Sequence, residues 1–261
     1  MKKIAIIGGG NLGTAIALGL IKSAFVPAAN ITVTKRNTET LGHLQSIGVK
    51  VSADNLAAVQ DNEIILLAVK PFQVKEVMEL IAPVLAPRHI VISVVTGISL
   101  AEMKSVIQND IPLFRAMPNT AIAIQESITC ISSVHTSEQD KQYVNGLFST
   151  LGKIAVIDEK LMNAATVLGA CGTAFAMRYI RANIQGGIEI GFDAATASLI
   201  AAQTVKGAAE LLLTTHTHPE QEIDKVTTPK GCTIAGLNEM EHQGFSSSLI
   251  KGISASFAKI G

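Results

Sequence analysis

The 261-residue chain has no tryptophan, and its aromatic residues together make up only 4% of the sequence. Single-stranded nucleic acids are bound by stacking their bases on aromatic side chains, so the composition argues against such a platform. An excess of charge of one sign is lacking too, since 21 basic and 21 acidic residues give a formal net charge of zero. Nucleic-acid backbones and anionic membranes are bound by an excess of positive charge. We therefore expect neither as a partner.

Cysteine is scarce, with only Cys130, Cys171 and Cys232. Their odd number and wide spacing predict neither a disulfide framework nor a CxxC metal clip. The six histidines form no ligand pattern, so no metal site is expected. No apolar run reaches the ~18 to 20 residues that span a bilayer, and the apolar N-terminal stretch breaks at three glycines without a cleavage signal. We expect a cytoplasmic protein that is neither exported nor inserted into a membrane.

Apolar residues are abundant instead, at 48% against 16% charged residues, which is enough for a sizeable core. The first 157 residues alternate β-branched runs with helical stretches, and this order is typical of a parallel, doubly wound sheet. Runs without alternation, such as Ile64–Val69, are typical of strands covered on both faces. Strands are predicted at 3–7, 31–34, 64–69, 90–95, 113–116, 128–132 and 153–157, and helices near 11–25, 37–47, 72–82, 99–108 and 137–151.

The pattern changes after Asp158, where strand signals vanish and long stretches rich in Ala, Leu and Ile begin. These stretches are apolar over too much of their circumference for surface helices of a monomer. The sequence thus predicts an α/β domain over residues 1–157 and an all-helical domain over 158–261 that forms an oligomer interface. Helices are predicted near 159–190, 194–214 and 232–260, with a break at 191–193 and a loop at 214–219.

A glycine pattern follows the first predicted strand: Gly8, Gly10 and Gly13 form G-x-G-x-x-G at the start of a helix. The first glycine permits a tight turn, the second lets the backbone approach a pyrophosphate, and the third lets helix and strand pack closely. The helix start supplies amide donors to the phosphates. Since strand, glycines and helix follow one another in the required order, the pattern predicts a dinucleotide site.

The end of the second strand bears on the choice of nucleotide. A fold that prefers NAD has Asp or Glu there to hold the ribose 2′-hydroxyl, but this chain reads Thr34-Lys35-Arg36-Asn37, with Glu39 as the first acid. A hydroxyl and two cations suit a 2′-phosphate, which favours NADP(H), with NAD(H) as the alternative. The competing interpretation is that Lys35 and Arg36 are solvated surface charges.

Several segments, from Ile4 to about Phe257, resemble the pyrroline-5-carboxylate reductase family. The strings AVKP (68–71), RAMPNT (115–120) and TTPKGCTIAGL (227–237) carry the resemblance most specifically. It implies a Rossmann domain followed by a helical domain that interlocks with a second subunit, in a homodimer or a higher homo-oligomer such as a decamer. It also implies the last step of proline biosynthesis, in which NADPH reduces 1-pyrroline-5-carboxylate, a cyclic imine, to L-proline.

The turn before the last predicted helix is the candidate substrate site. Free amides at a helix start suit a small carboxylate, although Thr228 or Thr233 could also serve simply as N-caps. The resemblance implies that the backbone of Cys232 and Thr233 holds the substrate carboxylate and that the Thr233 hydroxyl, the candidate catalytic group, lies near the ring nitrogen. The candidate substrate residues are Thr228, Gly231, Cys232, Thr233 and Gly172, and the candidate cofactor residues are Gly8, Gly10, Asn11, Leu12, Gly13, Thr34, Arg36, Asn55, Ala68, Val69, Lys70, Pro71, Thr96, Gly97 and Asn119.

Two departures from the family pattern keep alternatives open. Residues 169–175 read GACGTAF where the family has a stretch rich in serine and glycine, and Lys230 replaces a glycine. Since the first stretch borders the substrate in the family, a reductase of another imine, such as a piperideine carboxylate, is one alternative. Others are a non-catalytic NADP-binding regulator and a β-hydroxyacid-type dehydrogenase relying on a lysine such as Lys160 or Lys206. The proton source also stays open, water included.

Overall fold

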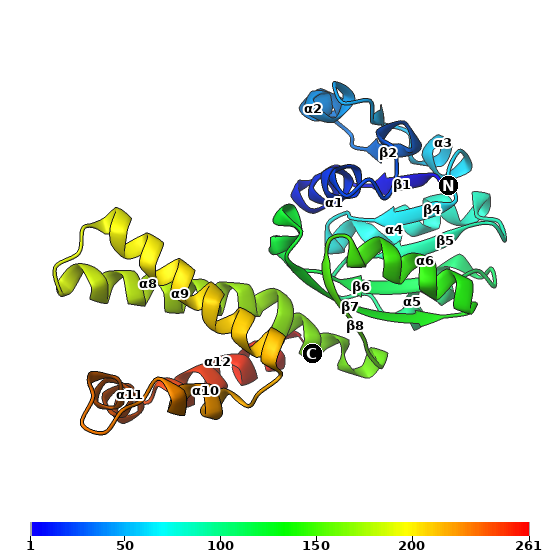
Figure 1. Cartoon of the computed structure of the whole chain (residues 1–261). Helices are drawn as coiled ribbons and strands as arrows, with labels where there is room; N and C mark the ends of the chain where they lie inside the picture. Colours follow the sequence, from blue (N-terminus) through cyan, green and yellow to red (C-terminus); the bar gives the residue numbers. More distant parts are fainter. Residues whose placement is uncertain (1, 261) are drawn as a thin grey trace. The chain divides into compact units, whose positions relative to one another are not determined.

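The computed structural model describes residues 2–260 and divides into two compact units, one ending at Cys171 and one running from Gly172 to Lys259 (Figure 1). The change in sequence pattern comes earlier, after Asp158. Residues 158–171 therefore pack with the first unit, although their composition is like that of the long helices.

The described part of the first unit contains one eight-stranded sheet in the order β3-β2-β1-β4-β5-β6-β7-β8. All neighbouring strands are parallel except β6 and β7. The predicted doubly wound sheet is thus confirmed, with its last two strands reversed. Only a short 3₁₀-helix, η4 (Thr120–Ile124), joins β6 to β7, which is too short for a parallel crossover. The strands are β1 (Ile4–Ile7), β2 (Ile31–Thr34), β3 (Lys50–Ser52), β4 (Ile64–Leu67), β5 (Ile90–Ser93), β6 (Leu113–Met117), β7 (Ser127–Val134) and β8 (Gly152–Val156).

Helices cover both faces of the sheet, which explains why its central strands read as unbroken apolar runs. In β1, Ile4 and Ile6 face one layer while Ala5 and Ile7 face the other, and all four are at most 1% exposed. The first layer consists of α1 (Asn11–Lys22), α2 (Gly42–Gln45) and α6 (Glu138–Ser149). The second consists of α3 (Asn55–Gln60), α4 (Pro71–Ile81) and α5 (Leu100–Ile107).

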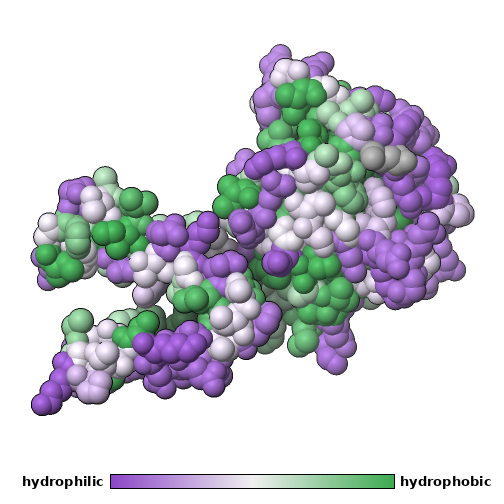
Figure 2. Space-filling view, viewed as in Figure 1, coloured by the Kyte–Doolittle hydropathy of each residue, from purple (hydrophilic) through white to green (hydrophobic). Residues whose placement is uncertain are grey.

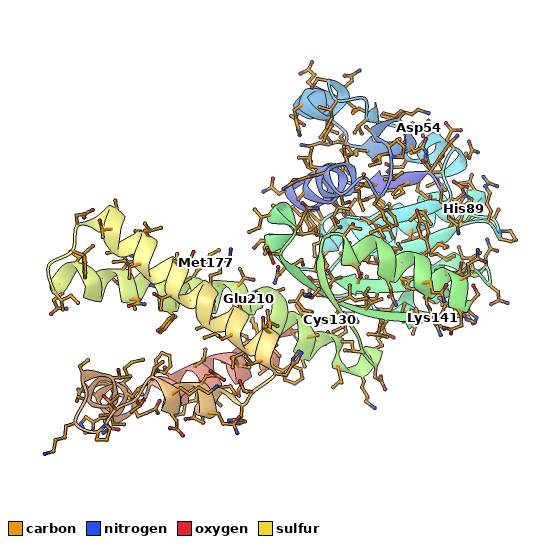
Figure 3. The ribbon with its side chains drawn as sticks, viewed as in Figure 1. Asp54, His89, Cys130, Lys141, Met177 and Glu210 are labelled. Atoms are coloured by element: carbon orange, nitrogen blue, oxygen red, sulfur yellow. The ribbon has the colours of Figure 1, made fainter. Side chains whose placement is uncertain are left out.

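Helix starts follow local sequence signals. Ser99 before α5 and Ser137 before α6 each form a capping box with the acidic residue three positions later. The Asp54 carboxylate accepts from the amides of Leu56 and Ala57 at the start of α3, where Figure 3 labels it. Neither α3 nor β3 is among the elements predicted from the sequence, because elements of six and three residues leave too little periodicity to detect.

The second unit is helical throughout its described part and contains α8 (Gly172–Glu189), α9 (Ala194–Thr215), α10 (Pro219–Lys225), α11 (Cys232–His242) and α12 (Phe245–Ile260). The predicted break between α8 and α9 is confirmed, with Gly191 at φ +114° and Asp193 capping α9. The single helix predicted over 232–260 is wrong, because the chain turns at Gly244, whose φ is +78°. The loop predicted at 214–219 is shorter than expected, and α10 follows it.

Large apolar side chains remain exposed on this helical unit. Met177 on α8 is 61% exposed, Leu199 on α9 is 71% exposed and Ile250 on α12 is 62% exposed (Figure 3 labels Met177). Figure 2 shows such hydrophobic groups at the surface among hydrophilic ones. Surfaces of this kind are typical of helices that are covered by a partner. Within residues 2–260, none of the helices combines the length and apolar character that crossing a membrane requires.

Candidate functional site

The glycine loop between β1 and α1 is shaped by close backbone contacts. Gly8 has φ +118°, and a Cβ atom there would lie 2.5 Å from the carbonyl oxygen of Ala68. A Cβ on Gly13 would overlap the carbonyl oxygen of Gly8, and one on Gly9 would lie 2.8 Å from a methyl group of Leu41. The amides of Gly8 and Gly9 donate to the carbonyl of Thr34 at 3.2 and 2.7 Å. Gly8 and Gly13 are therefore required by the backbone around them, whereas a side chain at Gly9 would displace Leu41.

Gly10 differs from the other three, because no atom lies within 4 Å of the position its Cβ would take. The protein thus leaves open the approach at which the motif predicts a pyrophosphate. Gly10 is also the N-cap of α1 and has no side chain to satisfy the first amides, those of Asn11, Leu12 and Gly13. A cleft of about 360 Å³ adjoins the loop. The loop therefore fits a dinucleotide phosphate without rearrangement.

Two further loops begin at the same edge of the sheet as the glycine loop. The amide of Ala68, after β4, donates to the carbonyl of Ile7 at 2.8 Å. Lys70 is the N-cap of α4 and is exposed, and Pro71 is its first residue, where a missing amide proton costs nothing. Thr96 and Gly97 follow β5 and are exposed. Because the carboxyl ends of parallel strands share one edge, the predicted cofactor loops come together there.

The residues that follow β2 have different surroundings. Thr34 is 1% exposed, and its carbonyl accepts the two glycine-loop amides, so it shapes the loop from inside. Arg36 is exposed. Lys35 is half-buried and lines the cleft beside the glycine loop. Asn55 is the first residue of α3, and the cap of that helix is Asp54, so its own side chain is not the cap.

Asn119 has a structural role that the sequence did not indicate. Its side-chain oxygen accepts from the amide of Ala121 at 3.1 Å, and its amide nitrogen donates to the carbonyl of Gly169 at 3.2 Å. Its backbone amide donates to the hydroxyl of Ser127 at 3.1 Å. Asn119 therefore joins the loop after β6 to the segment that precedes α8.

The segment ending at Cys171 is a π-helix over Thr166–Cys171, after which α8 begins at Gly172. Single π-turns are costly and occur often at functional sites. Gly172 is half-buried. The stretch that departs from the family pattern, residues 169–175, thus spans the junction of a π-turn and a long helix.

The predicted substrate turn lies in the second unit, before α11. The amide of Gly231 donates to the carbonyl of Thr228 at 2.9 Å, which closes a turn with Pro229 at its second position. Lys230, at the third position, has φ +60°, where glycine is usual. A Cβ on Gly231 would lie 2.5 Å from the Thr228 hydroxyl, so this position accepts only glycine without movement.

Gly231 is the N-cap of α11 and offers no side-chain cap. The amides of Cys232 and Thr233 belong to the first turn, which has no intrahelical acceptors for them. Cys232 is exposed and Thr233 is half-buried, so both can be reached by a small solute. The interpretation of Thr228 or Thr233 as a side-chain N-cap does not apply, because the N-cap is Gly231.

An ion pair that the sequence does not indicate links distant segments of the first unit. The Arg115 side chain, on β6, is 6% exposed, and its Nη1 lies 3.5 Å from Oε1 of Glu159. The same carboxylate oxygen accepts from the amide of Leu100 at 2.6 Å, at the start of α5. Arg115 Nε has no hydrogen-bond partner among the described residues. The pair connects β6 to the segment after β8, and the bond from Leu100 extends this link to the start of α5. Nothing in the local sequence around Arg115 indicates a partner 44 residues away.

No group of three or more His, Cys, Asp or Glu side chains within residues 2–260 is arranged to hold a metal ion. The chemistry available at the two sites is therefore that of backbone amides, hydroxyls and cations. Amides at the glycine loop suit phosphates, and amides at the start of α11 suit a carboxylate.

Comparisons with known proteins agree with this arrangement. Residues 159–261 match the family model of pyrroline-5-carboxylate reductase dimerisation, and residues 3–97 match that of coenzyme F420-dependent NADP oxidoreductases. Pyrroline-5-carboxylate reductase 1 of Dictyostelium discoideum is 48% identical over 98% of this chain, which spans about half (49%) of that relative's length. Reductase 2 of the same organism is 46% identical, with 99% of this chain and 92% of the relative covered.

Among solved structures, the fold is similar to a Plasmodium falciparum pyrroline carboxylate reductase with NADP bound. The TM-score is 0.90 at 25% identity, with 99% of this chain and 97% of that one covered. Likeness in sequence and in fold thus extends over both units and not over the nucleotide-binding part alone. The chain belongs to the pyrroline-5-carboxylate reductase family.

Proposed function

We propose that this protein reduces 1-pyrroline-5-carboxylate to L-proline with NADPH, the last step of proline biosynthesis. The observation that carries the proposal is the start of α11, where the amides of Cys232 and Thr233 are accessible and no side chain caps the helix. Such a helix start binds a small carboxylate. The names of the relatives, which span both units, supply the reaction.

The substrate is a cyclic imine that carries a carboxylate. In the proposed arrangement Thr228 and Gly231 form the turn, the amides of Cys232 and Thr233 hold the carboxylate, and Gly172 leaves room beside it. The Thr233 hydroxyl hydrogen-bonds the ring nitrogen and orients it. Because the pKa of a hydroxyl lies far above neutral, Thr233 orients the imine or relays a proton rather than acting as a strong acid, and water is the simplest proton source.

NADPH, when bound, supplies the hydride that reduces the carbon of the C=N bond, while the nitrogen gains a proton. The chain's own contribution is to hold and orient the two reactants. The first amides of α1 would hold the pyrophosphate, and the loops after β4 and β5 would hold the rest of the cofactor. In this assignment the cofactor residues are those named from the sequence: Gly8, Gly10, Asn11, Leu12, Gly13, Thr34, Arg36, Asn55, Ala68, Val69, Lys70, Pro71, Thr96, Gly97 and Asn119.

The helical unit is proposed to form a homodimer or a higher homo-oligomer such as a decamer. The exposed apolar side chains of α8, α9 and α12 support this proposal, as does the match of residues 159–261 to a dimerisation family. A cytoplasmic location is proposed from the free cysteines, which a reducing compartment preserves. Light scattering at micromolar concentration tests the assembly, and a monomer would contradict it.

The test of the reaction is direct. Purified protein is mixed with NADPH and 1-pyrroline-5-carboxylate, and the loss of reduced nicotinamide absorbance is followed together with the appearance of proline. Turnover with proline formed supports the proposal. Bound NADPH without turnover would contradict it. The six-membered piperideine carboxylate is assayed in parallel because residues 169–175 depart from the family pattern, and one methylene changes kcat/KM by roughly 10- to 200-fold in a fitted pocket.

A further inference from the structure

Residues 96–99, named here the β5 loop, are open to a ligand in the same way as the glycine loop. Gly97 has φ +80°, and no atom lies within 4 Å of the position that its Cβ would take. In the sheet order, β2 lies on one side of β1, and β4 and β5 lie on the other. Since the adenosine ribose of a dinucleotide binds at the end of β2, its nicotinamide half reaches toward β4 and β5. The β5 loop would therefore lie beside the reacting end of the cofactor.

Contacts with β6 and with the segment after β8 hold both ends of the β5 loop. At one end, the Thr96 hydroxyl donates to Sδ of Met117 at 3.8 Å. At the other end, the amide of Leu100 donates to Oε1 of Glu159 at 2.6 Å, and the same oxygen is 3.5 Å from Nη1 of Arg115. Arg115 and Met117 are two positions apart on β6, so they lie on the same face of the sheet. One strand thus secures the β5 loop at both ends.

The bond to Glu159 is not needed to cap α5. Ser99 is the N-cap, and its hydroxyl accepts from the amide of Glu102 at 3.1 Å. The Glu102 carboxylate accepts from the amide of Ser99 at 2.7 Å, which completes the capping box. Glu159 adds a second carboxylate from 59 residues beyond Leu100. Its contribution is therefore to fix where the end of the β5 loop lies relative to β6.

Arg115 is a costly residue for this part of the core. Its side chain is 6% exposed, its Nη1 and Nη2 lie 3.5 Å from oxygens of Glu159 and Asn163, and its Nε has no hydrogen-bond partner among residues 2–260. Apolar side chains of similar size often stabilise a protein as well as a buried ion pair does. Stability alone therefore does not account for an arginine here. What arginine provides and an apolar residue does not is a fixed position for the Glu159 carboxylate.

We propose that Arg115 and Glu159 are positioning residues for the reduction: Arg115 holds the Glu159 carboxylate, which through the amide of Leu100 fixes the β5 loop against the nicotinamide half of the cofactor. The inference rests on the proposed function for the reaction and adds two residues that touch neither substrate nor cofactor. Hydride transfer depends steeply on the alignment of the two reacting carbons. A small displacement of the β5 loop therefore lowers the rate while most binding contacts stay in place.

The test separates the rate of hydride transfer from binding. Arg115→Met, Glu159→Gln and the double variant are compared with the parent protein in single turnovers at saturating NADPH and imine. Each single substitution is expected to lower the rate roughly 10- to 100-fold. The affinity for adenosine 2′,5′-bisphosphate, which lacks the nicotinamide, should change less than about twofold. Because Arg115 acts through Glu159, the double variant should be no slower than the slower single variant.

Ser137→Ala is the matched control for lost stability. It removes the N-cap of α6, which lies in the other helix layer, at a cost to folding similar to that of Glu159→Gln. Its single-turnover rate should stay within about twofold of the parent rate. Unchanged rates in both single variants would overturn the proposal. Independent losses that multiply in the double variant, or an equal loss in Ser137→Ala, would overturn it too.

A second readout does not depend on turnover. The fluorescence of bound NADPH reports the surroundings of its nicotinamide, and it is expected to differ from the parent in the Arg115 and Glu159 variants but not in Ser137→Ala. A parent protein that forms no proline, with this fluorescence difference present, would refute the proposed reaction and leave the positioning role standing. The absence of the difference in such a protein would overturn the inference as well.

Discussion

Gly10 and Gly13 lie three residues apart in one motif, yet substitution by alanine should affect them in opposite ways. At Gly13 the new methyl group overlaps the carbonyl oxygen of Gly8, which is held by the backbone on both sides. Overpacking of this kind costs up to about 3 kcal/mol. Alanine gains back about 1 kcal/mol over glycine inside a helix. The Gly13→Ala protein should therefore lose about 2 kcal/mol of stability, or roughly 4 to 8 °C in Tm.

At Gly10 the same methyl group enters open space, and the backbone angles of φ −83° and ψ −170° are accessible to alanine. Replacing an N-cap glycine costs only about 0.5 kcal/mol. In the proposed NADPH complex, however, the methyl group would occupy the approach of the pyrophosphate. If the strain is about 1 to 3 kcal/mol, NADPH should bind roughly 5- to 150-fold more weakly.

The assay combines thermal unfolding with NADPH binding by fluorescence. We expect a folded Gly10→Ala protein with weak NADPH binding and a destabilised Gly13→Ala protein. A Gly10→Ala protein that binds NADPH as tightly as the parent would refute the reasoning, because the bound cofactor would then not occupy the open space at Gly10. If the urea midpoint of unfolding fell equally in both variants, the close contact between Gly13 and Gly8 would not explain the loss of stability at Gly13.

Three further outcomes follow from the structure. Thr233→Ala should lower kcat/KM for the imine about ten- to thousandfold with little change in NADPH binding. Thr233→Ser, which retains the hydroxyl, should keep most of the activity. Equal activity of the alanine variant and the parent would remove the hydroxyl from the mechanism. Glu159→Gln should lower the free energy of unfolding in urea by about 1 to 2 kcal/mol, because the buried Arg115 loses its counter-charge. The loss is limited because the Glu159 side chain is 30% exposed, and an unchanged urea midpoint would contradict this prediction. Burial, with a smaller effect of the nearby Arg88, lowers the pKa of His89 from its ordinary 6.5. The unfolded chain then binds the extra proton, so this stabilisation should be complete above about pH 6.5 and decline at lower pH, with His89→Gln flattening the profile.

The order of strands and helices in the first unit follows from the sequence for a clear physical reason. A strand buried on both faces is apolar at nearly every position, so β4, and β5 up to Ser93, are visible as runs. The glycine motif has a fixed spacing because the strand end, the turn and the helix start that it forms are adjacent in sequence, although Gly8 also packs on Ala68. The proposed substrate turn is likewise readable in Thr228–Thr233, since the turn and the helix start lie within six residues.

Other features depend on contacts between distant residues, and only the tertiary structure determines them. The reversal of β7 follows from a connection too short for a crossover, which hydrophobic periodicity does not report. Asn119 donates a hydrogen bond to Gly169, fifty residues away, and Arg115 forms an ion pair with Glu159. The sequence near Asn119 and Arg115 gives no indication of either partner. The sequence by itself determined the elements and the local motifs, because short-range sterics and burial specify them, whereas packing decided which side chains meet.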